Sequence, residues 1–356
     1  MKPAIVLLLM VGMVFHPTSQ ARVTQKGLDI YWCDVEGGAA TLIVTPAGES
    51  ILIDSGWPGG RDSARIARIA REIAGLRQID HAITTHWHVD HVGGLSELSA
   101  VIPIRRFYDG GFPEPSQRDV SWELIASYKR VAEGRRTVLR AGQQIPLKQA
   151  PGAPRVTLTV VAARGVVIGE KQPSPQIRAC PITPPHPAKP LDEGDDARSL
   201  AFVLTFGEWR FFDAGDLSWN VEHKLVCPNN LIGEVDVYQV TCHGAAASNN
   251  PAILEGLRPR VAIMNNGARK GGQPGVVRAV KELVGNDAFF ALHRNVHTGP
   301  DDNALPELTA NDQEDCAGEY IALSVASDGH SYIVRIPSKK TFKTFMTRTQ
   351  KRRSSR

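Results

Sequence analysis

The stretch that decides the fold of this 356-residue chain reads HWHVDHVGG, from His86 to Gly94. Its three histidines and one aspartate lie within six residues, a pattern that the packing of a hydrophobic core does not require. In an extended segment, residues i and i+2 point to the same side, so His86 and His88 can bind one metal ion together. Asp90 and His91 lie where the chain should turn into a helix, and they can face a second metal ion. Imidazole suits zinc, and a neighbouring carboxylate supports a hydrolytic site.

Strands and helices are predicted to alternate around this motif. Apolar runs predict strands over 28–34, 40–45, 50–53 and 81–85. Helical spacing of apolar residues predicts a helix over 62–76, and a second helix is expected over 91–99. Gly93 and Gly94 would permit close packing where that second helix begins.

The second half of the chain continues in the same way. It predicts strands over 155–162, 200–206, 209–213, 235–241, 260–264, 319–327 and 331–336, with helices around 222 and over 276–284. The stretch 141–195 is rich in Pro and Gly and, apart from the strand at 155–162, is predicted to be mostly loop. Because strand–helix units occur in both halves, we expect a single domain over 22–338 in which two sheets face each other with helices outside.

The spacing His-x-His-x-Asp-His, after a strand that ends Ile53-Asp54-Ser55-Gly56, resembles the metallo-β-lactamase superfamily. The resemblance covers about residues 28–283 and implies an α/β fold, a four-layer αβ/βα sandwich with a mono- or dinuclear metal site at one edge. It further implies a bridging aspartate and a final histidine at strand ends, which Asp216 and His243 match. Asp54 matches the buried aspartate that would hold the ligands in place. The implied metal ligands are His86, His88, Asp90, His91, Asp216 and His243.

One ligand position of that family has no histidine here. The family often has a third histidine on the first metal, upstream of the bridging aspartate, where this chain reads DDARSL over 195–200. Asp195, the nearby His186 or a water molecule could complete that site. Cys242 could also bind a metal, since it lies beside a matched ligand, but we expect it to be a small buried residue.

Several short motifs resemble a subgroup of the superfamily, the hydrolase domain of bacterial competence DNA-uptake proteins. They are Asp34-Val35-Glu36-Gly37-Gly38, Gly215-Asp216-Leu217 with Glu222 six residues later, and Cys242-His243-Gly244. That subgroup usually has His-His-Gly at the last position and a later Gly-His-Pro, where this chain has Gly272-Gln273-Pro274. The resemblance implies a phosphodiester or related ester as substrate, small or polymeric. No channel segments accompany the domain, so neither DNA uptake nor a transmembrane partner is implied.

The implied cofactors are two divalent metal ions, with zinc expected and manganese as the alternative. Such ions lower the pKa of a shared water molecule from 15.7 towards ~7, and Asp90 would be the catalytic residue that positions this nucleophile. A hydrolase of a cyclic amide or lactone, such as a β-lactam, is an alternative function. A metal-poor binding protein on the same fold is another. His293 and His297 could approach the site, but we expect them on the surface.

The first 21 residues have the features of a signal peptide. Lys2 supplies the positive charge, residues 4–15 are apolar, and small residues at Ser19 and Ala21 precede the expected cleavage point. An uncleaved N-terminal anchor is the alternative. The sequence therefore predicts an exported protein, periplasmic or secreted.

Composition and charge exclude several other classes. With 42% hydrophobic and 22% charged residues, the chain has enough apolar material for a core and is not disordered throughout. The net charge is +4, but residues 339–356 contain eight basic residues and no acid, so the rest of the chain is net negative and no general nucleic-acid binder. We expect 339–356 to be a disordered basic tail that could contact polyanions. Because the chain has five cysteines, at least one thiol stays outside any disulfide bond within the chain, unless it pairs with a cysteine of another chain.

Overall fold

One β-sheet is built mainly from the N-terminal half of the chain. The computed structural model describes residues 26–171 and 189–348, and places nine strands in this sheet. In spatial order they are β18 (Thr341–Met346), β17 (Ser331–Ile336), β16 (Ile321–Val325), β1 (Leu28–Trp32), β2 (Thr41–Val44), β3 (Ser50–Ile53), β4 (Ile79–Thr84), β5 (Ile104–Asp109) and β6 (Arg136–Val138). Because β3 and β4 pair in parallel, the segments that follow them begin at the same edge of the sheet.

The second sheet contains the remaining nine strands of the described residues. In spatial order they are β15 (Thr309–Asn311), β14 (Phe289–His293), β13 (Val261–Met264), β12 (Val237–Gln239), β11 (Trp209–Asp213), β10 (Ala201–Phe206), β8 (Val156–Ala163) and β7 (Gln144–Ile145), and β9 (Val166–Val167) pairs with β8. Strands β11 to β15 are parallel neighbours. The loops after β11 and β12 therefore also leave the sheet at one edge.

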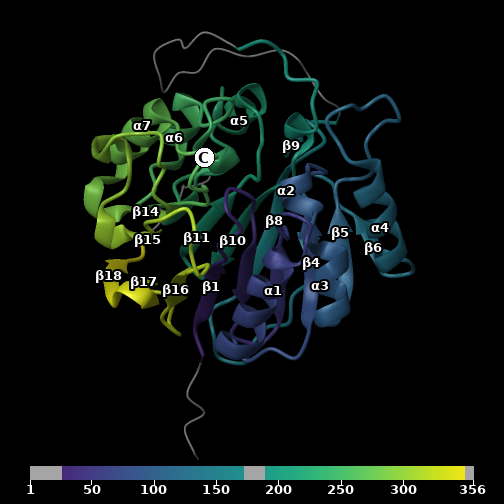
Figure 1. The fold of residues 1–356 in the computed structure, drawn as a ribbon, viewed down its shortest axis with the longest axis horizontal. Helices are drawn as coiled ribbons and strands as arrows, with labels where there is room; N and C mark the ends of the chain where they lie inside the picture. Colours follow the sequence, from purple (N-terminus) through teal and green to yellow (C-terminus); the bar gives the residue numbers. More distant parts are fainter. Residues whose placement is uncertain (1–25, 172–188, 349–356) are drawn as a thin grey trace, which may run out of the picture.

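Helices cover the outer faces of the two sheets. They are α1 (Arg61–Arg68), α2 (Val89–Val92), α3 (Leu95–Val101), α4 (Trp122–Ala132), α5 (Trp219–Val226), α6 (Pro251–Leu257) and α7 (Pro274–Val284). Figure 1 shows the blue helices α1, α3 and α4 on one side of the molecule and the green helices α5, α6 and α7 on the other, with the strands between them.

Three apolar clusters fill the spaces between these layers. Alternate residues of a strand point to opposite faces, and in β1 the side chains of Leu28, Ile30 and Trp32 are buried between the sheets. Tyr31, between them, belongs to the cluster under α1, α3 and α4. A third cluster joins the second sheet to α5, α6 and α7, with Leu225 at its centre. The three clusters separate four layers, which confirms the expected αβ/βα sandwich.

Two local predictions need correction. The helix expected over 62–76 ends as an α-helix at Arg68 and continues as one π-helical segment, Ile69–Ile73. The stretch 141–195 contains β7 and β9 as well as the predicted strand, because its short extended runs pair with β8. Both errors concern runs too short for hydrophobic periodicity to identify.

The expectation of a disordered tail from 339 is wrong for residues 341–346. They form β18, which pairs antiparallel with β17 along its whole length. The basic side chains find acidic partners on the body of the chain: Lys339 lies 2.7 Å from Asp312, and Arg348 lies 3.0 Å from Glu234. Local ion pairs therefore offset the charge run, and the fold extends past residue 338.

The predicted signal peptide lies outside the described residues, as does the end of the basic tail, 349–356. Within 26–171 and 189–348, none of the helices has the length and apolar character needed to span a bilayer.

Candidate metal centre

The six predicted ligands converge at the edge where the strand ends meet. Residues 85–88 follow β4 and carry His86 and His88, and α2 then carries Asp90 and His91. Asp216 follows β11, and His243 lies in the short turn Thr241–Gly244 after β12. Side chains that are 157 residues apart in the sequence thus meet at one place, in two groups that each suit a metal ion.

The first group consists of His86, His88 and Asp196. The Nε2 atom of His86 lies 3.4 Å from Oδ1 of Asp196, and Nδ1 of His88 lies 3.0 Å from the same oxygen. All three ligand atoms lie within 4.8 Å of one another. His86 is buried, whereas the other two side chains are partly accessible, so this group faces the open side of the centre.

The second group consists of Asp90, His91, Asp216 and His243, and all four are buried. The Nε2 atom of His91 is 3.3 Å from a carboxylate oxygen of Asp90 and 3.3 Å from one of Asp216. The Nε2 atom of His243 is 3.2 Å from each of the same two side chains. Two imidazoles and two carboxylates therefore point at one small volume.

The two groups are adjacent, because the rings of His86 and His91 have centroids 4.0 Å apart. The donor atoms are better placed to bind a metal ion than to form hydrogen bonds with one another. Nε2 of His86 is buried and, among the described residues, has no hydrogen-bond partner, although Oδ1 of Asp196 lies 3.4 Å away. Buried polar atoms are normally hydrogen-bonded, so an unpartnered imidazole nitrogen that faces a second imidazole and a carboxylate indicates a ligand set for a cation.

The electrostatics of the centre also favour a cation. Burial raises the pKa of Asp216, but His243 and His91 outweigh this and hold it well below its usual value. Burial lowers the pKa of His91, but Asp216 and Asp90 outweigh this and raise it well above its usual value. For His86, burial and the neighbouring His91 lower the pKa well below the ordinary value, so this ring is neutral and can donate a lone pair.

Asp54, which the resemblance matched to a supporting residue, is hydrogen-bonded to the second group. It is buried, and its Oδ2 atom lies 2.8 Å from Nδ1 of His91. Its carboxylate also accepts hydrogen bonds from the backbone N–H and the hydroxyl of Thr85, at 2.8 and 2.7 Å. Since Nδ1 of His91 is engaged in this way, its Nε2 atom is fixed towards the centre.

The glycines at the start of the second helix are required for close packing, as predicted. A Cβ atom on Gly93 would lie 2.2 Å from the carbonyl oxygen of Val89, and one on Gly94 would lie 2.3 Å from that of Ser55. Larger residues would push apart the turn that carries Asp90 and His91. Helix formation there is split, with α2 ending at Val92 and α3 beginning at Leu95.

Lys270 is a residue of the centre that the sequence did not reveal. Its ammonium group is hydrogen-bonded to Oδ2 of Asp90, while 41% of the side chain is exposed. The lysine comes from the loop after β13 and lies 5.0 Å from the ring centroid of Trp57. The negative charge of Asp90 thus already attracts a cation from the protein itself.

The structure shows which carboxylate of the segment DDARSL lies beside the first two histidines. Asp196, rather than Asp195, faces His86 and His88. Asp195 instead accepts a hydrogen bond from the backbone N–H of Trp87, and His186 lies outside the described residues. The residue motif DDARSL pointed to the right segment, but only the turn Asp196–Arg198 decides which carboxylate faces the histidines.

Cys242 is buried, and among the described clusters it is not grouped with the ligands. Burial raises the pKa of this thiol well above its usual value, which fits the expected role of a small buried residue. The expectation of a surface position holds for His297, which is exposed, but is wrong for His293. Nε2 of His293 lies 2.7 Å from Oδ1 of Asp34, inside the protein.

His293 belongs to a separate buried cluster, which we call the Asp34 network: Asp34, His293, Cys316 and Arg65. Sγ of Cys316 is 3.3 Å from Oδ2 of Asp34, and Nη1 of Arg65 is 2.9 Å from the same oxygen. An aspartate, a histidine and a cysteine again lie within 4.8 Å of one another, but here a guanidinium group occupies one side.

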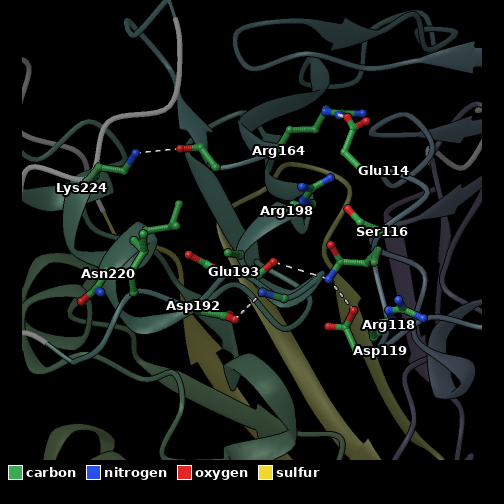
Figure 2. A pocket seen from close by; sticks show the side chains of 16 residues that line it. Glu114, Ser116, Arg118, Asp119, Arg164, Asp192, Glu193, Arg198, Asn220 and Lys224 are labelled. Carbon is green, nitrogen blue, oxygen red and sulfur yellow. Dashed lines mark hydrogen bonds and ion pairs between the residues drawn. The ribbon is translucent and has the colours of Figure 1, made fainter.

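A cavity of about 870 Å³ opens beside the first group (Figure 2). Its walls come from residues 114–119, from the β8–β9 turn, from residues 191–198 and from α5. Oδ2 of Asp119, on its wall, lies 3.2 Å from Nε2 of His88. The cavity therefore shares a wall with the metal centre and is large enough for a small-molecule ligand.

Comparisons with known proteins agree with this site. The model of the metallo-beta-lactamase superfamily matches residues 33–155, which include Asp54 and the whole motif from His86 to Gly94. This segment, about a third of the chain, is therefore similar to that superfamily.

Among curated proteins, the chain is similar to the atrochrysone carboxyl ACP thioesterase of Aspergillus fumigatus, with 34% identity over 86 residues. The match covers 23% of this chain and about a quarter of that relative, 27% of its length.

Similar solved structures include a putative metal-dependent hydrolase from Parabacteroides distasonis, with 14% identity, 74% of this chain and 91% of that chain covered, and a TM-score of 0.38. A metallo-β-lactamase from Cronobacter sakazakii matches with 17% identity, 59% and 73% coverage, and a TM-score of 0.33. CmlA, a diiron beta-hydroxylase from Streptomyces venezuelae, matches with 16% identity, 66% and 44% coverage, and a TM-score of 0.37.

Proposed function

We propose that this protein is an exported metal-dependent hydrolase that binds two divalent cations and cleaves a phosphodiester or a related ester. The observation that carries the proposal is the adjacency of two ligand groups, one of His86, His88 and Asp196 and one of Asp90, His91, Asp216 and His243. A divalent cation in such a centre polarises the substrate oxygen and lowers the pKa of water to about 7.

The chain's own residues would divide the work as follows. Each group would hold one cation, and Asp216 would be one of the ligands of the second group. Asp54 would keep His91 oriented through the hydrogen bond to Nδ1. Asp90 would position the attacking water and hold its proton on Oδ2, an atom that already accepts a hydrogen bond from Lys270. We infer zinc because each group contains two imidazoles, a ligand type that suits zinc, with manganese as the alternative.

The phosphodiester substrate is supported by the motifs shared with competence proteins. One of them, Glu222, is fully buried, and its carboxylate accepts a hydrogen bond from the backbone N–H of Asn250 at 2.8 Å. This bond ties α5 to the start of α6, behind the loop that carries His243. Glu222 thus supports the centre from outside and leaves the ligand positions free.

A carboxylic thioester is the second candidate substrate. The observation in its favour is the similarity to the ACP thioesterase of Aspergillus fumigatus, whose name specifies that chemistry. Two cations that polarise an ester oxygen serve a carbonyl carbon as well as a phosphorus, so the metal centre permits both.

Export is supported by the N-terminal sequence and by cysteine chemistry. Cys227 is disulfide-bonded, and disulfides persist mainly outside the cytoplasm. A contact with polyanions would depend on residues 349–356, since the basic side chains Lys339, Lys343 and Arg348 already face acidic partners.

The test measures bound metal and turnover on the same preparation. The chain, purified without residues 1–21, is assayed with bis(4-nitrophenyl) phosphate, an aryl thioester and a chromogenic β-lactam. We expect about two metal ions per chain and phosphodiester turnover that His88→Ala abolishes. The matched control is His297→Ala, because His297 is an exposed histidine outside the ligand groups.

The other outcomes separate the alternatives. Turnover of the thioester alone supports the second candidate, and turnover of the β-lactam alone supports a cyclic-amide hydrolase. Less than about half a metal ion per chain without any turnover would contradict the proposal and favour a binding protein.

A further inference from the structure

The wall of the cavity of about 870 Å³ beside the metal centre includes the half-buried Arg198 (Figure 2). The Nη1 atom of Arg198 is buried and donates to no acceptor among the described residues. A guanidinium nitrogen can only donate, so it needs an acceptor oxygen. An unsatisfied charged donor is costly inside a protein, which makes this atom an indication of a ligand.

Two other cations of the cavity wall, Arg164 and Lys224, are already engaged, and a third, Arg118, is exposed. Arg164 donates to the carbonyl oxygen of Phe112 at 3.1 Å and to Glu114 at 3.3 Å. Lys224 donates to the carbonyl oxygen of Gly165 at 2.7 Å. Figure 2 shows Arg164 and Arg198 on the same side of the cavity, with Lys224 across from them.

The carboxylates of the wall do not supply the missing acceptor. Oδ1 of Asp192 accepts the backbone N–H of Gly194 at 2.8 Å. Asp119 accepts the backbone N–H of Asp195 at 2.9 Å, and its Oδ2 atom also lies near His88. The acidic side chains are thus held by other donors, or, like Glu193, are exposed.

Arg198 also links the cavity to the reacting end of the site. Arg198 and Arg164 line a second, small niche, whose other walls include Thr85, His86 and Trp87. Arg198 ends the turn that begins with Asp196, the carboxylate that faces His86. Arg198 therefore lines both the cavity and the niche that His86 borders.

We propose that Arg198 binds an anionic group of the substrate, a carboxylate or a phosphate, which lies at a distance from the bond that is cleaved. The planar fork of arginine matches two oxygens of either group. The cavity is thus a specificity pocket for an ester with a second, negatively charged end. This inference rests on the proposed function, because it names the substrate class of the same site.

The test compares substrates that share the reacting bond and differ in charge at the far end. For the carboxylate, mono-4-nitrophenyl glutarate is compared with 4-nitrophenyl pentanoate. For the phosphate, thymidine 3′-(4-nitrophenyl phosphate) is compared with and without a 5′-phosphate. We expect Arg198→Gln to lower kcat/KM about 10- to 100-fold for the member of a pair that carries the far-end charge, mainly through KM, and less than twofold for the member without it.

Two variants serve as controls. Arg155→Gln removes an exposed arginine at the opposite end of β8 and should change neither ratio. Arg198→Lys keeps the charge without the fork and should restore part of the preference. If Arg198→Gln does not fold, two other measurements test the inference. They are the kcat/KM ratio of each substrate pair in Arg198→Lys and the dependence of the wild-type ratio on salt concentration.

A binding measurement separates this inference from the proposed function. Calorimetric titration of glutarate and of phosphate into the metal-free protein should show binding that Arg198→Gln weakens about tenfold or more. Binding without ester turnover would leave Arg198 as an anion site and overturn the proposed function. Ester turnover with equal charge preference in wild type and Arg198→Gln, or equal binding to both, would overturn the inference.

Discussion

The candidate metal centre and the Asp34 network both contain buried aspartate and histidine side chains, yet we propose only the first as a site for a cation from outside. In both, a buried aspartate lies within 2.8 Å of a histidine nitrogen: Asp54 at His91 and Asp34 at His293. In both, ligand atoms of three or more residues lie within 4.8 Å of one another. Proximity of such residues alone therefore does not distinguish the two regions.

Charge balance and access do distinguish them. In the Asp34 network, Arg65 donates to Asp34 at 2.9 Å and to the carbonyl oxygen of Cys316 at 3.0 Å, and its side chain is only 12% exposed. In the metal centre the corresponding protein cation is Lys270, which is 41% exposed and comes from a loop. A buried arginine with several acceptors is a permanent counterion, whereas an exposed lysine can move away when a metal binds.

The largest expected effect is the loss of activity in Asp216→Ala. Asp216 faces both His91 and His243, so its removal takes away a negative charge and a ligand from the buried group. We expect turnover to fall by about 10³-fold and bound metal to fall from about two ions per chain to one or fewer. Metal analysis and steady-state kinetics on the same sample measure both.

The control for this variant is Asp213→Asn, three residues earlier on the same strand end. Asp213 is buried but is not part of either ligand group, and its Oδ1 atom accepts the backbone N–H of Gly215. Its variant should keep most of its metal. If Asp216→Ala retained two ions and full turnover, the assignment of the centre would be wrong.

The next largest effect is expected on stability, in the other region. Asp34→Ala leaves the buried His293 without its counterion and removes the buried one of the two carboxylates that pair with Arg65, the other being Glu36. Breaking a buried pair in this way costs about 3–5 kcal/mol of unfolding free energy. Urea unfolding followed by circular dichroism measures it, and the metal content per folded chain should stay unchanged.

Asp315→Ala is the matched control, since Asp315 is an exposed aspartate next to Cys316. It should change the free energy of unfolding by less than about 0.5 kcal/mol. A loss of bound metal in Asp34→Ala without a loss of stability would show that the Asp34 network is a metal site after all.

The contrast between the regions also explains how far sequence reasoning reached. The sequence alone predicts one set of ligands, His86, His88, Asp90 and His91. Their spacing is so short that secondary-structure geometry brings them together. Asp216 and His243 followed from strand ends in the pattern of a known superfamily. The fold could be predicted for the same reason, since buried strands and helices carry strong periodicity.

What the sequence could not provide depends on contacts between distant segments. The sequence favours Asp195 over Asp196 as a ligand. In a short turn, however, a shift of the backbone by one residue decides which of the two carboxylates faces the histidines. His293 was expected on the surface, since nothing local shows that a strand end will be buried against Asp34, 259 residues away. Lys270 is identified by its hydrogen bond to Asp90, and Arg198 by its Nη1 atom, which has no acceptor among the described residues. Both observations depend on the folded chain.

A smaller effect should separate the two aspartate–histidine pairs. Asp54→Asn keeps the size of the side chain but weakens the hold on Nδ1 of His91, and such changes behind a metal ligand cost about 10–100-fold in activity or affinity. Asp34→Asn makes the same change at His293 and should leave kcat/KM within twofold. Parallel kinetics on the two variants make the comparison, and equal losses in both would mean that the regions are coupled.

The smallest effect is a pH dependence of stability that belongs to His293. Burial lowers the pKa of this histidine, but its hydrogen bond to Asp34 outweighs burial and raises the pKa to about 9. The groups that face it are Asp34, Cys316 and, through Asp34, Arg65. Because the folded pKa lies above the unfolded value of about 6.5, the protonated ring stabilises the fold fully below pH 6.5, and this contribution disappears as the pH rises through about 9.

The measurement is the difference in unfolding free energy between the wild type and His293→Gln, because the difference cancels the titration of other histidines. We expect the unfolding free energy of the wild type to exceed that of the variant at pH 6, and this difference to decrease steadily up to pH 9. Cys316→Ser should retain the slope, which separates the imidazole from the nearby thiol. A difference in unfolding free energy that is constant between pH 6 and 9 would mean that His293 is neutral in the folded protein and that Arg65 alone balances the charge of Asp34. The neutral imidazole of His293 could then bind a metal ion.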